Sequence, residues 1–338
     1  MNVISLHKPV WDALQKRREK MPHALLLSGQ RGLGKFELAR TFAASLLCES
    51  PLAEGNACGH CLACNWFAQG NHPDFRLLQP DALSDTGDNE DAKKKASQQI
   101  TIDQVRELDD FLTVGTHRDG LRVILINPTE AMNRSTANSL LKSLEEPTPN
   151  TLFLLVTNEP LRLLPTLRSR CQSVAIHMPD RQHAIQALSE AGIAQAERWL
   201  ALAGGAPGLA ITLSTSGEMQ WIDLMLKQIG EGRAIDPLSL AAELDKTLRE
   251  SKGKVLLKSM VELLQKWLVD LTLASNQLAP RYFVQQEAKI KDLAAMIPSS
   301  KLLKAYRETL VRRREAEQPL NARLFLESLL MDYRTLFS

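Results

Sequence analysis

The sequence predicts an α/β domain with a mostly parallel sheet, followed by an all-α second half. Up to about residue 178, short aliphatic runs alternate with helical patterns, which is typical of parallel strands covered by helices. After Pro179 the strand patterns stop, and helices separated by Gly and Pro breaks continue to Ser338. At about 100 to 200 residues per domain, a chain of 338 residues has room for two or three domains.

Five strands are expected in the first half, at residues 24–27, 75–78, 122–126, 151–156 and 173–177. Between them, apolar residues recur at helical spacing at 38, 42 and 46, and again at 102, 105, 108 and 112. Thr101 and Gln104 fit a capping box at the start of the second of these helices. The polar stretch 79–99 has no periodicity, so we expect a surface insertion there.

Composition and charge exclude several classes of protein. Forty-one Lys and Arg against 39 Asp and Glu leave a net charge of +2, and 44% of the residues are hydrophobic. This balance excludes wholesale disorder and a protein whose entire surface grips nucleic acid. The longest apolar runs, such as 152–156, are far too short to span a membrane, and the start lacks a signal-peptide core. We therefore expect a cytoplasmic protein with no membrane partner.

A phosphate-binding loop is indicated directly after the first expected strand. Gly29, Gly34 and Lys35 fit the G-x-x-x-x-G-K part of a Walker A loop. In such a loop, backbone N–H groups and the lysine hold phosphate oxygens at the start of a helix. The next residue should be Ser or Thr, whose hydroxyl binds Mg²⁺, but here it is Phe36.

The second magnesium-binding element of such a site is also missing. Acidic residues should follow the third expected strand, but Asn127 and Pro128 stand there. We interpret the nearby Glu130 and Asp110 as ordinary surface acids. Because phosphoryl transfer depends on the metal, we expect a nucleotide-hydrolase fold without hydrolysis and with little or no ATP binding.

Four cysteines indicate a metal site. Cys48, Cys58, Cys61 and Cys64 have the spacing C-x9-C-x2-C-x2-C, in which each C-x2-C step lets two thiolates converge on one ion. Four thiolates satisfy a structural Zn²⁺ with no open position for catalysis. An iron–sulfur cluster is the metal alternative, and free buried thiols are the non-metal one. His60 and His72 are possible substitutes for one cysteine, while Cys171 is expected to be a packed thiol.

Together these motifs resemble the bacterial clamp-loader AAA+ proteins. The stretches that carry the likeness are the cysteine module, HALLLSGQRGLGK at 23–35, HPDFRLL at 72–78, AMNRSTANSLLKSLEEP at 131–147, LRSRC at 167–171 and NARLFLESLLMDY at 321–333. They cover nearly the full length, and NSLLKSLEEP with SRC is far more specific than the P-loop alone. The resemblance implies a RecA-like AAA+ domain at 1–178 with the zinc module at 48–64, a helical lid at 179–219 and a helical collar for oligomerisation at 220–338.

The resemblance also implies roles for individual residues. Arg170 of the SRC motif corresponds to an arginine finger that reaches the ATP of a neighbouring subunit; closing a helix or pairing with an acid of its own domain is the alternative. Gly208 stands where ATP-hydrolysing relatives carry a sensor arginine, which is a third loss. Arg134 and Lys142 are candidates for contact with the DNA backbone, with solvated helix charges as the alternative.

The partners implied by the resemblance are the gamma or tau and delta subunits of a five-subunit clamp loader, the sliding clamp and, through the complex, primed DNA. In such a complex this chain resembles a rigid, ATPase-inactive stator. Two competing hypotheses remain: a motor subunit that hydrolyses ATP, and a zinc-dependent scaffold without a finger.

Overall fold

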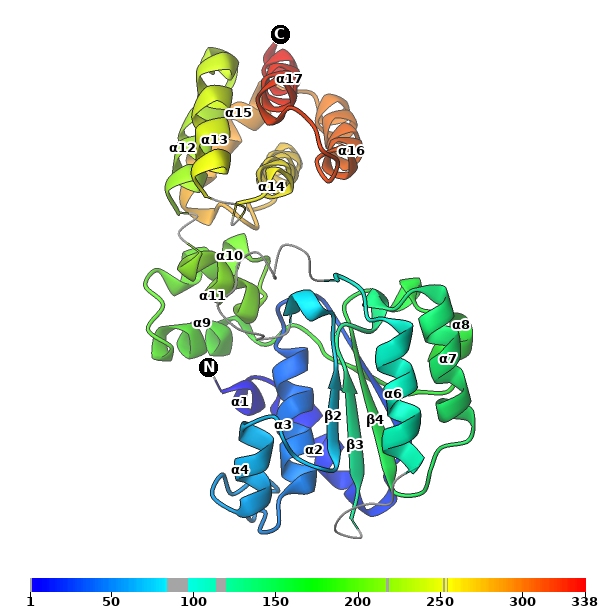
Figure 1. Cartoon of the computed structure of the whole chain (residues 1–338). Coiled ribbons are helices and arrows are strands. Elements are labelled where there is room, and N and C mark those ends of the chain that lie inside the picture. Colours follow the sequence, from blue (N-terminus) through cyan, green and yellow to red (C-terminus); the bar gives the residue numbers. More distant parts are fainter. Residues whose placement is uncertain (1, 84–96, 114–119, 217–218, 252, 254) are drawn as a thin grey trace. The chain divides into compact units, whose positions relative to one another are not determined.

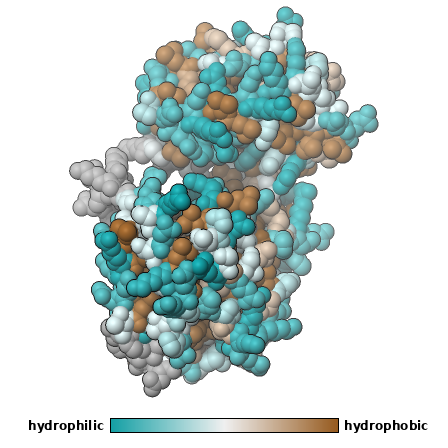
Figure 2. Space-filling view, turned by 90° about the vertical axis from the view of Figure 1, so that its right-hand side faces the viewer, coloured by the Kyte–Doolittle hydropathy of each residue, from teal (hydrophilic) through white to brown (hydrophobic). Residues whose placement is uncertain are grey.

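A computed structural model describes residues 2–83, 97–113, 120–216, 219–251, 253 and 255–338. The chain divides into two compact units, residues 1–183 and 184–338. The centre of the predicted insertion, 84–96, lies outside the described residues. Among the residues that the structure covers, none of the helices combines the length and the apolar character needed to cross a membrane. Hydrophilic side chains cover much of the face seen in Figure 2, with small apolar patches between them.

The first unit is built on a five-stranded sheet in which every pairing is parallel. The order is β2-β3-β4-β1-β5. The strands are β1 (Ala24–Ser28), β2 (Phe75–Leu78), β3 (Arg122–Ile126), β4 (Thr151–Thr157) and β5 (Gln172–Ala175). The predicted parallel α/β sheet is therefore confirmed, and the strand expected at 173–177 begins and ends slightly earlier.

The aliphatic runs form strands because helices cover both faces of the sheet. Every residue of β3 and β4 is buried. The helices near one face are α1 (Val3–Leu6), α2 (Lys8–Lys16), α3 (Lys35–Leu47) and α4 (Leu62–Ala68), and those near the other are α6 (Ile102–Thr113), α7 (Arg134–Glu145) and α8 (Pro165–Arg168) (Figure 1). The predicted capping box is present, since the backbone N–H of Thr101 donates to Gln104 Oε1 and that of Gln104 to Thr101 Oγ1.

As the sequence predicts, the described residues of the second half form helices joined by loops and no strands. Its helices are α9 (Arg181–Glu190), α10 (Ala196–Leu202), α11 (Pro207–Thr215), α12 (Met219–Ile229), α13 (Pro237–Glu250), α14 (Leu257–Ser275), α15 (Glu287–Ala295), α16 (Ser299–Glu315) and α17 (Ala322–Arg334). Helix α14 supplies much of the core. Its Trp267 is fully buried and donates to Tyr333 Oη at 2.9 Å, and that hydroxyl donates to the carbonyl of Ile229 at 2.7 Å. The division of this half into lid and collar stays a prediction.

Candidate functional site

The loop between β1 and α3 contains both glycines of the predicted Walker A loop. Gly34 is the N-cap of α3 and has a φ of 76°, in the left-handed region that favours glycine. Gly29 is needed for a different reason, because a Cβ added there would collide with the backbone carbonyl oxygen of Ile176. The two glycines of the predicted Walker A loop are therefore where the backbone requires them.

Lys35, the first residue of α3, points its ammonium group into the protein. Its side chain is buried, with the residue only 3% exposed. Its Nζ donates to the carbonyl of Gln30 at 2.5 Å and to Oδ1 of Asn158 at 2.8 Å. Burial lowers the pKa of Lys35 from its ordinary value to about 8, and the negative charge of Glu130 opposes that shift. The protein itself thus supplies acceptors for a lysine that normally faces phosphate.

The prediction that Glu130 is an ordinary surface acid is wrong. Glu130 is half-buried, and its Oε1 accepts hydrogen bonds from the backbone N–H of Asn158 at 3.0 Å and from Asn158 Nδ2 at 2.9 Å. Its Oε2 is buried and has no hydrogen-bond partner among the described residues. These contacts arise because β3 and β4 are neighbours, which brings the residues after their carboxyl ends together. Asp110, in contrast, is exposed on α6, in agreement with its prediction as a surface acid.

The residues at the two positions of the missing magnesium ligands are built into the fold. Phe36 is half-buried in the first turn of α3 and offers no oxygen ligand. Asn127 follows β3 and donates its backbone N–H to the carbonyl of Leu78. Sequence reasoning missed His7, which is 4% exposed and lies 2.6 Å, through Nε2, from the carbonyl of Leu33 in the loop. Because burial lowers the pKa of His7, its neutral form donates this bond and anchors the loop.

The four predicted cysteine ligands come together. The Sγ atoms of Cys48, Cys58, Cys61 and Cys64 all lie within 4.8 Å of one another. Cys48 follows the end of α3, and Cys61 is the N-cap of α4. The backbone N–H of Cys58 donates to Cys48 Sγ at 3.3 Å, and that of Cys61 to Cys58 Sγ at 3.3 Å. The cluster could hold a metal ion.

Hydrogen bonding and burial act on these thiols in opposite directions. The backbone N–H of His60 is the largest cause that lowers the pKa of Cys58, to about 6. Burial raises the pKa of Cys64, so its proton has to be displaced when a cation binds. The side chain of His60 is exposed, and neither it nor the buried His72 belongs to the cluster. Cys171 lies apart, and burial raises its pKa to about 11, as expected for a packed thiol.

Arg170 lies in the turn between α8 and β5. Its guanidinium forms an ion pair with Glu145, the last residue of α7, and donates to the carbonyl of Thr166 at 2.8 Å. The side chains of Arg170 and Glu145 are 32% and 48% exposed. Since β5 and β1 are parallel neighbours, Arg170 precedes one edge of the sheet while the P-loop follows the opposite edge. The backbone at Arg170 is therefore separated from its own P-loop by about one strand length, roughly 15 Å.

A family comparison decides what kind of chain this is. The family model described as DNA polymerase III, delta subunit, matches residues 7–180. DNA polymerase III subunit delta′ of Pseudomonas aeruginosa is 38% identical over 238 residues, which are 68% of this chain and 68% of that relative. The chain belongs to the DNA polymerase III subunit delta′ family. The resemblance read from the P-loop, NSLLKSLEEP and SRC stretches is confirmed.

Two further likenesses extend past the matched range. DNA polymerase III subunit tau of Escherichia coli is 28% identical over 342 aligned positions, which cover 92% of this chain and 50% of tau. Among solved structures, a DNA polymerase III gamma subunit-related protein from Thermotoga maritima matches 97% of this chain and 99% of that one, with a TM-score of 0.45 and 18% identity. The P-loop, the cysteine cluster and Arg170 all lie inside residues 7–180.

Two of the remaining predicted residues of this delta′ family member, Arg134 and Lys142, are on the surface. Arg134 begins α7 and Lys142 lies two turns further along the same helix, and both are exposed. Gly208 is in the first turn of α11 and presents no side chain.

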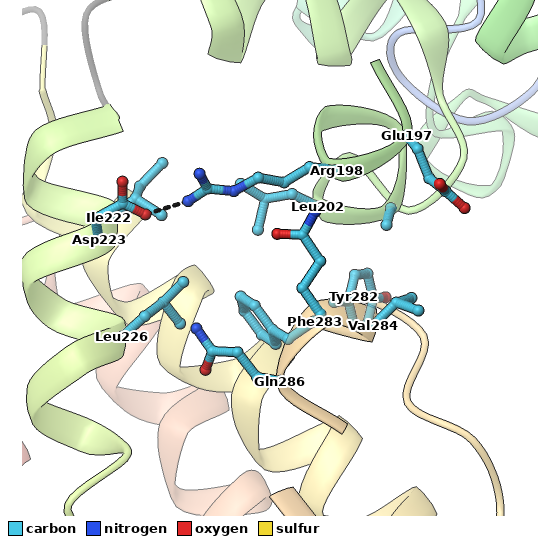
Figure 3. A pocket seen from close by; sticks show the side chains of 12 residues that line it. Glu197, Arg198, Leu202, Ile222, Asp223, Leu226, Tyr282, Phe283, Val284 and Gln286 are labelled. Carbon is cyan, nitrogen blue, oxygen red and sulfur yellow. Dashed lines mark hydrogen bonds and ion pairs between the residues drawn. The ribbon is translucent and has the colours of Figure 1, made fainter. Parts of the chain in front are cut away.

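A cavity of about 270 Å³ opens in the second unit between α10, α12 and the segment 282–286 (Figure 3). Arg198 of α10 and Asp223 of α12 form an ion pair at its wall. Phe283 lies on the opposite side, where the buried Asp270 carboxylate accepts the backbone N–H groups of residues 281–283 at 2.8 to 2.9 Å. Aromatic rings and one ion pair between neighbouring helices line this cavity, which is typical of packing between helices. We propose no ligand for it.

Proposed function

We propose that the chain is an ATPase-inactive subunit of the DNA polymerase III clamp loader that supplies Arg170 as an arginine finger to a neighbouring ATPase subunit. In this role it acts as a stator while the loader places a sliding clamp on primed DNA. Membership of the delta′ family supports the assignment to the loader and to the DNA polymerase III holoenzyme. The proposal includes a cytoplasmic location and a RecA-like domain followed by lid and collar.

The absence of hydrolysis is supported by the residues at the metal positions. Phe36 replaces the hydroxyl that binds Mg²⁺, and Asn127 replaces the acidic residue after β3. Without the metal, a bound triphosphate would lack the charge neutralisation that phosphoryl transfer requires. Gly208, in place of a sensor arginine, is consistent with the same loss.

The position of Arg170 carries the finger role. Arg170 precedes β5, at the amino ends of the strands, whereas its own P-loop follows β1 at their carboxyl ends, which supports a role toward a neighbouring subunit. It is partly exposed, and its ion pair with Glu145 is at the surface, where such pairs contribute only about 0–1 kcal/mol. Arg170 can therefore leave Glu145 at small cost and bind a phosphate through two parallel N–H groups.

A structural zinc ion is part of the proposal. Cys48, Cys58, Cys61 and Cys64 supply the four thiolates that closed zinc sites use, and their convergence supports this set over either histidine. When bound, the zinc would crosslink the end of α3 to the start of α4 and provide no catalytic position. The exposed Arg134 and Lys142 are proposed contacts to the DNA backbone.

The deciding experiment measures ATP turnover by a reconstituted loader that contains gamma or tau, delta and this chain. We expect the isolated chain to be silent and the DNA-stimulated rate of the complex to fall with Arg170→Ala. Loss of an arginine finger typically reduces turnover at its site by about 10³ to 10⁵. Arg170→Lys should also lower the rate, since a single ammonium cannot form the two parallel hydrogen bonds of a guanidinium to a phosphate.

Arg168→Ala is the matched control, because Arg168 is an exposed arginine of the same turn region. It should leave the rate unchanged. If Arg170→Ala leaves the ATPase rate of the complex unchanged, the zinc-dependent scaffold is favoured. The internal Arg170–Glu145 ion pair is the observation that supports this alternative. Turnover by the isolated chain would favour a motor subunit.

A further inference from the structure

Three polar side chains at the carboxyl edge of the sheet have no part in the finger role. Lys35 follows β1, Asn158 follows β4 and Glu130 follows β3. The order β3-β4-β1 in the sheet places the three residues in the same sequence, with Asn158 in the middle. Its Oδ1 accepts from Lys35 and its Nδ2 donates to Glu130, so the amide joins the ammonium to the carboxylate.

We propose that Glu130 and Asn158 act as a built-in counter-anion that occupies the phosphate-binding group of the P-loop, Lys35, and excludes nucleoside triphosphates and other polyphosphates. This inference rests on the proposed lack of ATPase activity and offers a structural reason for it. Phe36 explains why Mg²⁺ is not bound, but it leaves the backbone cradle and the lysine intact. The occupied lysine explains why the anion itself is not bound.

The hydrogen bonds of the three residues support this exclusion. Lys35 is 3% exposed, and two of its three N–H donors are held by Gln30 at 2.5 Å and Asn158 at 2.8 Å. The Asn158 amide cannot turn away freely, because Glu130 Oε1 holds both its Nδ2 and its backbone N–H. A polyphosphate that takes Lys35 therefore has to break a connected set of bonds.

Electrostatics act in the same direction. Glu130 is half-buried, and its Oε2 is buried without a hydrogen-bond partner among the described residues. An incoming phosphate would place a second anion near this carboxylate and remove the cation that now balances it. A half-buried carboxylate that loses its nearby cation to a phosphate is less stable, so the ligand would have to offset that cost before binding.

The test uses the purified full chain and inorganic tripolyphosphate without Mg²⁺, measured by titration calorimetry. We expect no saturable binding by the wild type at millimolar ligand. Glu130→Gln, which keeps the size and the Oε1 acceptor, and Asn158→Ala, which keeps the carboxylate of Glu130, should each bind saturably, with a Kd at least tenfold below the highest ligand concentration at which the wild type does not bind. Glu159→Gln is the matched control, because Glu159 is the adjacent residue, pairs with Arg162 at the surface and carries the same charge. It should behave as the wild type.

A second readout follows Lys35 directly by NMR of chains that carry ¹³Cε-labelled lysine. Glu130→Gln should lower the pKa of Lys35 further, since the charge that opposes the effect of burial is lost. Tight binding by the wild type, or folded variants that remain silent in the titration, would overturn the proposal. If Asn158→Ala does not fold, the nearly isosteric Glu130→Gln decides.

The outcome is separable from that of the finger experiment. The titration involves no partner subunit and no ATP turnover. If the variants do not bind tripolyphosphate, the counter-anion proposal fails, while the role of Arg170 is still decided by the loader experiment. Conversely, a loader that is indifferent to Arg170→Ala has no bearing on whether Glu130→Gln opens the P-loop.

Discussion

The P-loop and the cysteine cluster differ in how their polar atoms are satisfied. In the P-loop, the ammonium of Lys35 is satisfied by a carbonyl and by an amide that a carboxylate holds. In the cysteine cluster, four sulfur atoms face one another within 4.8 Å. A site whose charges are balanced from within has no need of a ligand, whereas thiols that lose their protons at such short distances need a cation to offset their mutual repulsion.

The largest effect should come from removing a ligand of the cysteine cluster. We expect Cys61→Ser to lose one equivalent of zinc and to lower the free energy of unfolding of the first unit by on the order of 3 kcal/mol. For a unit of this size, each kcal/mol corresponds to about 2–4 °C in Tm. Metal analysis and thermal denaturation of the full chain, with and without a chelator, measure both.

Cys171→Ser is the control for that experiment. Cys171 is a thiol outside the cluster, so its replacement should leave the metal content unchanged. Retention of a full equivalent of zinc by Cys61→Ser would contradict the comparison, because the cluster would then not depend on its thiols.

The second effect comes from the buried lysine; its upper bound is similar in size, and it depends on pH. The pKa of Lys35 is about 8 in the folded chain and near its ordinary 10.5 when unfolded. Between these values the unfolded state binds more protons, so the stability of the wild type rises with pH over this window, while the full penalty applies below pH 8. The lowered pKa corresponds to at most about 3.4 kcal/mol.

Lys35→Met removes this titration. The difference in unfolding free energy between wild type and Lys35→Met should therefore move in favour of the wild type as the pH rises from 8 to 10.5. Urea denaturation at several pH values measures the two slopes. Parallel slopes would mean that the ammonium is not held in a buried position, and the contrast between the two sites would weaken.

The smallest effect should follow from freeing Arg170. Glu145→Gln removes the charge from a partly exposed ion pair, and such pairs contribute about 0–1 kcal/mol. We expect stability to change by less than about 1 kcal/mol and the loader to keep its full rate, because the finger no longer has to leave a carboxylate. A large loss of stability would identify Glu145 as a structural anchor and count against a mobile finger.

Local patterns predicted much of the fold and of the cysteine site. The strands at 75–78 and 122–126 have the expected bounds, because the aliphatic runs end at polar or turn residues. The cysteine cluster was predictable because its four cysteines lie close together in the sequence, at spacings typical of metal ligands. The strand at 172–175 was less well placed, since it lies at the sheet edge and only Val174 in it is buried.

The internal partners of the P-loop could not be predicted in the same way. Glu130 and Asn158 are 28 residues apart, and only the pairing of β3 with β4 brings them together. Asn158 has one weak signal, a polar residue directly after a buried strand. His7 has none beyond its place in an N-terminal amphipathic segment, because its contact with Leu33 depends on how that segment packs.

Helix α3 joins the two contrasting sites. It begins at Lys35 and ends where Cys48 follows, and its 13 residues span about 20 Å. A hydrogen-bonded helix of this length moves as a rigid body, so a displacement of its end at Cys48 also displaces its start at Lys35. If the cluster holds the proposed zinc ion, its removal should change the surroundings of the Lys35 ammonium at the other end of the helix, and the NMR signal of Lys35 would then report metal occupancy.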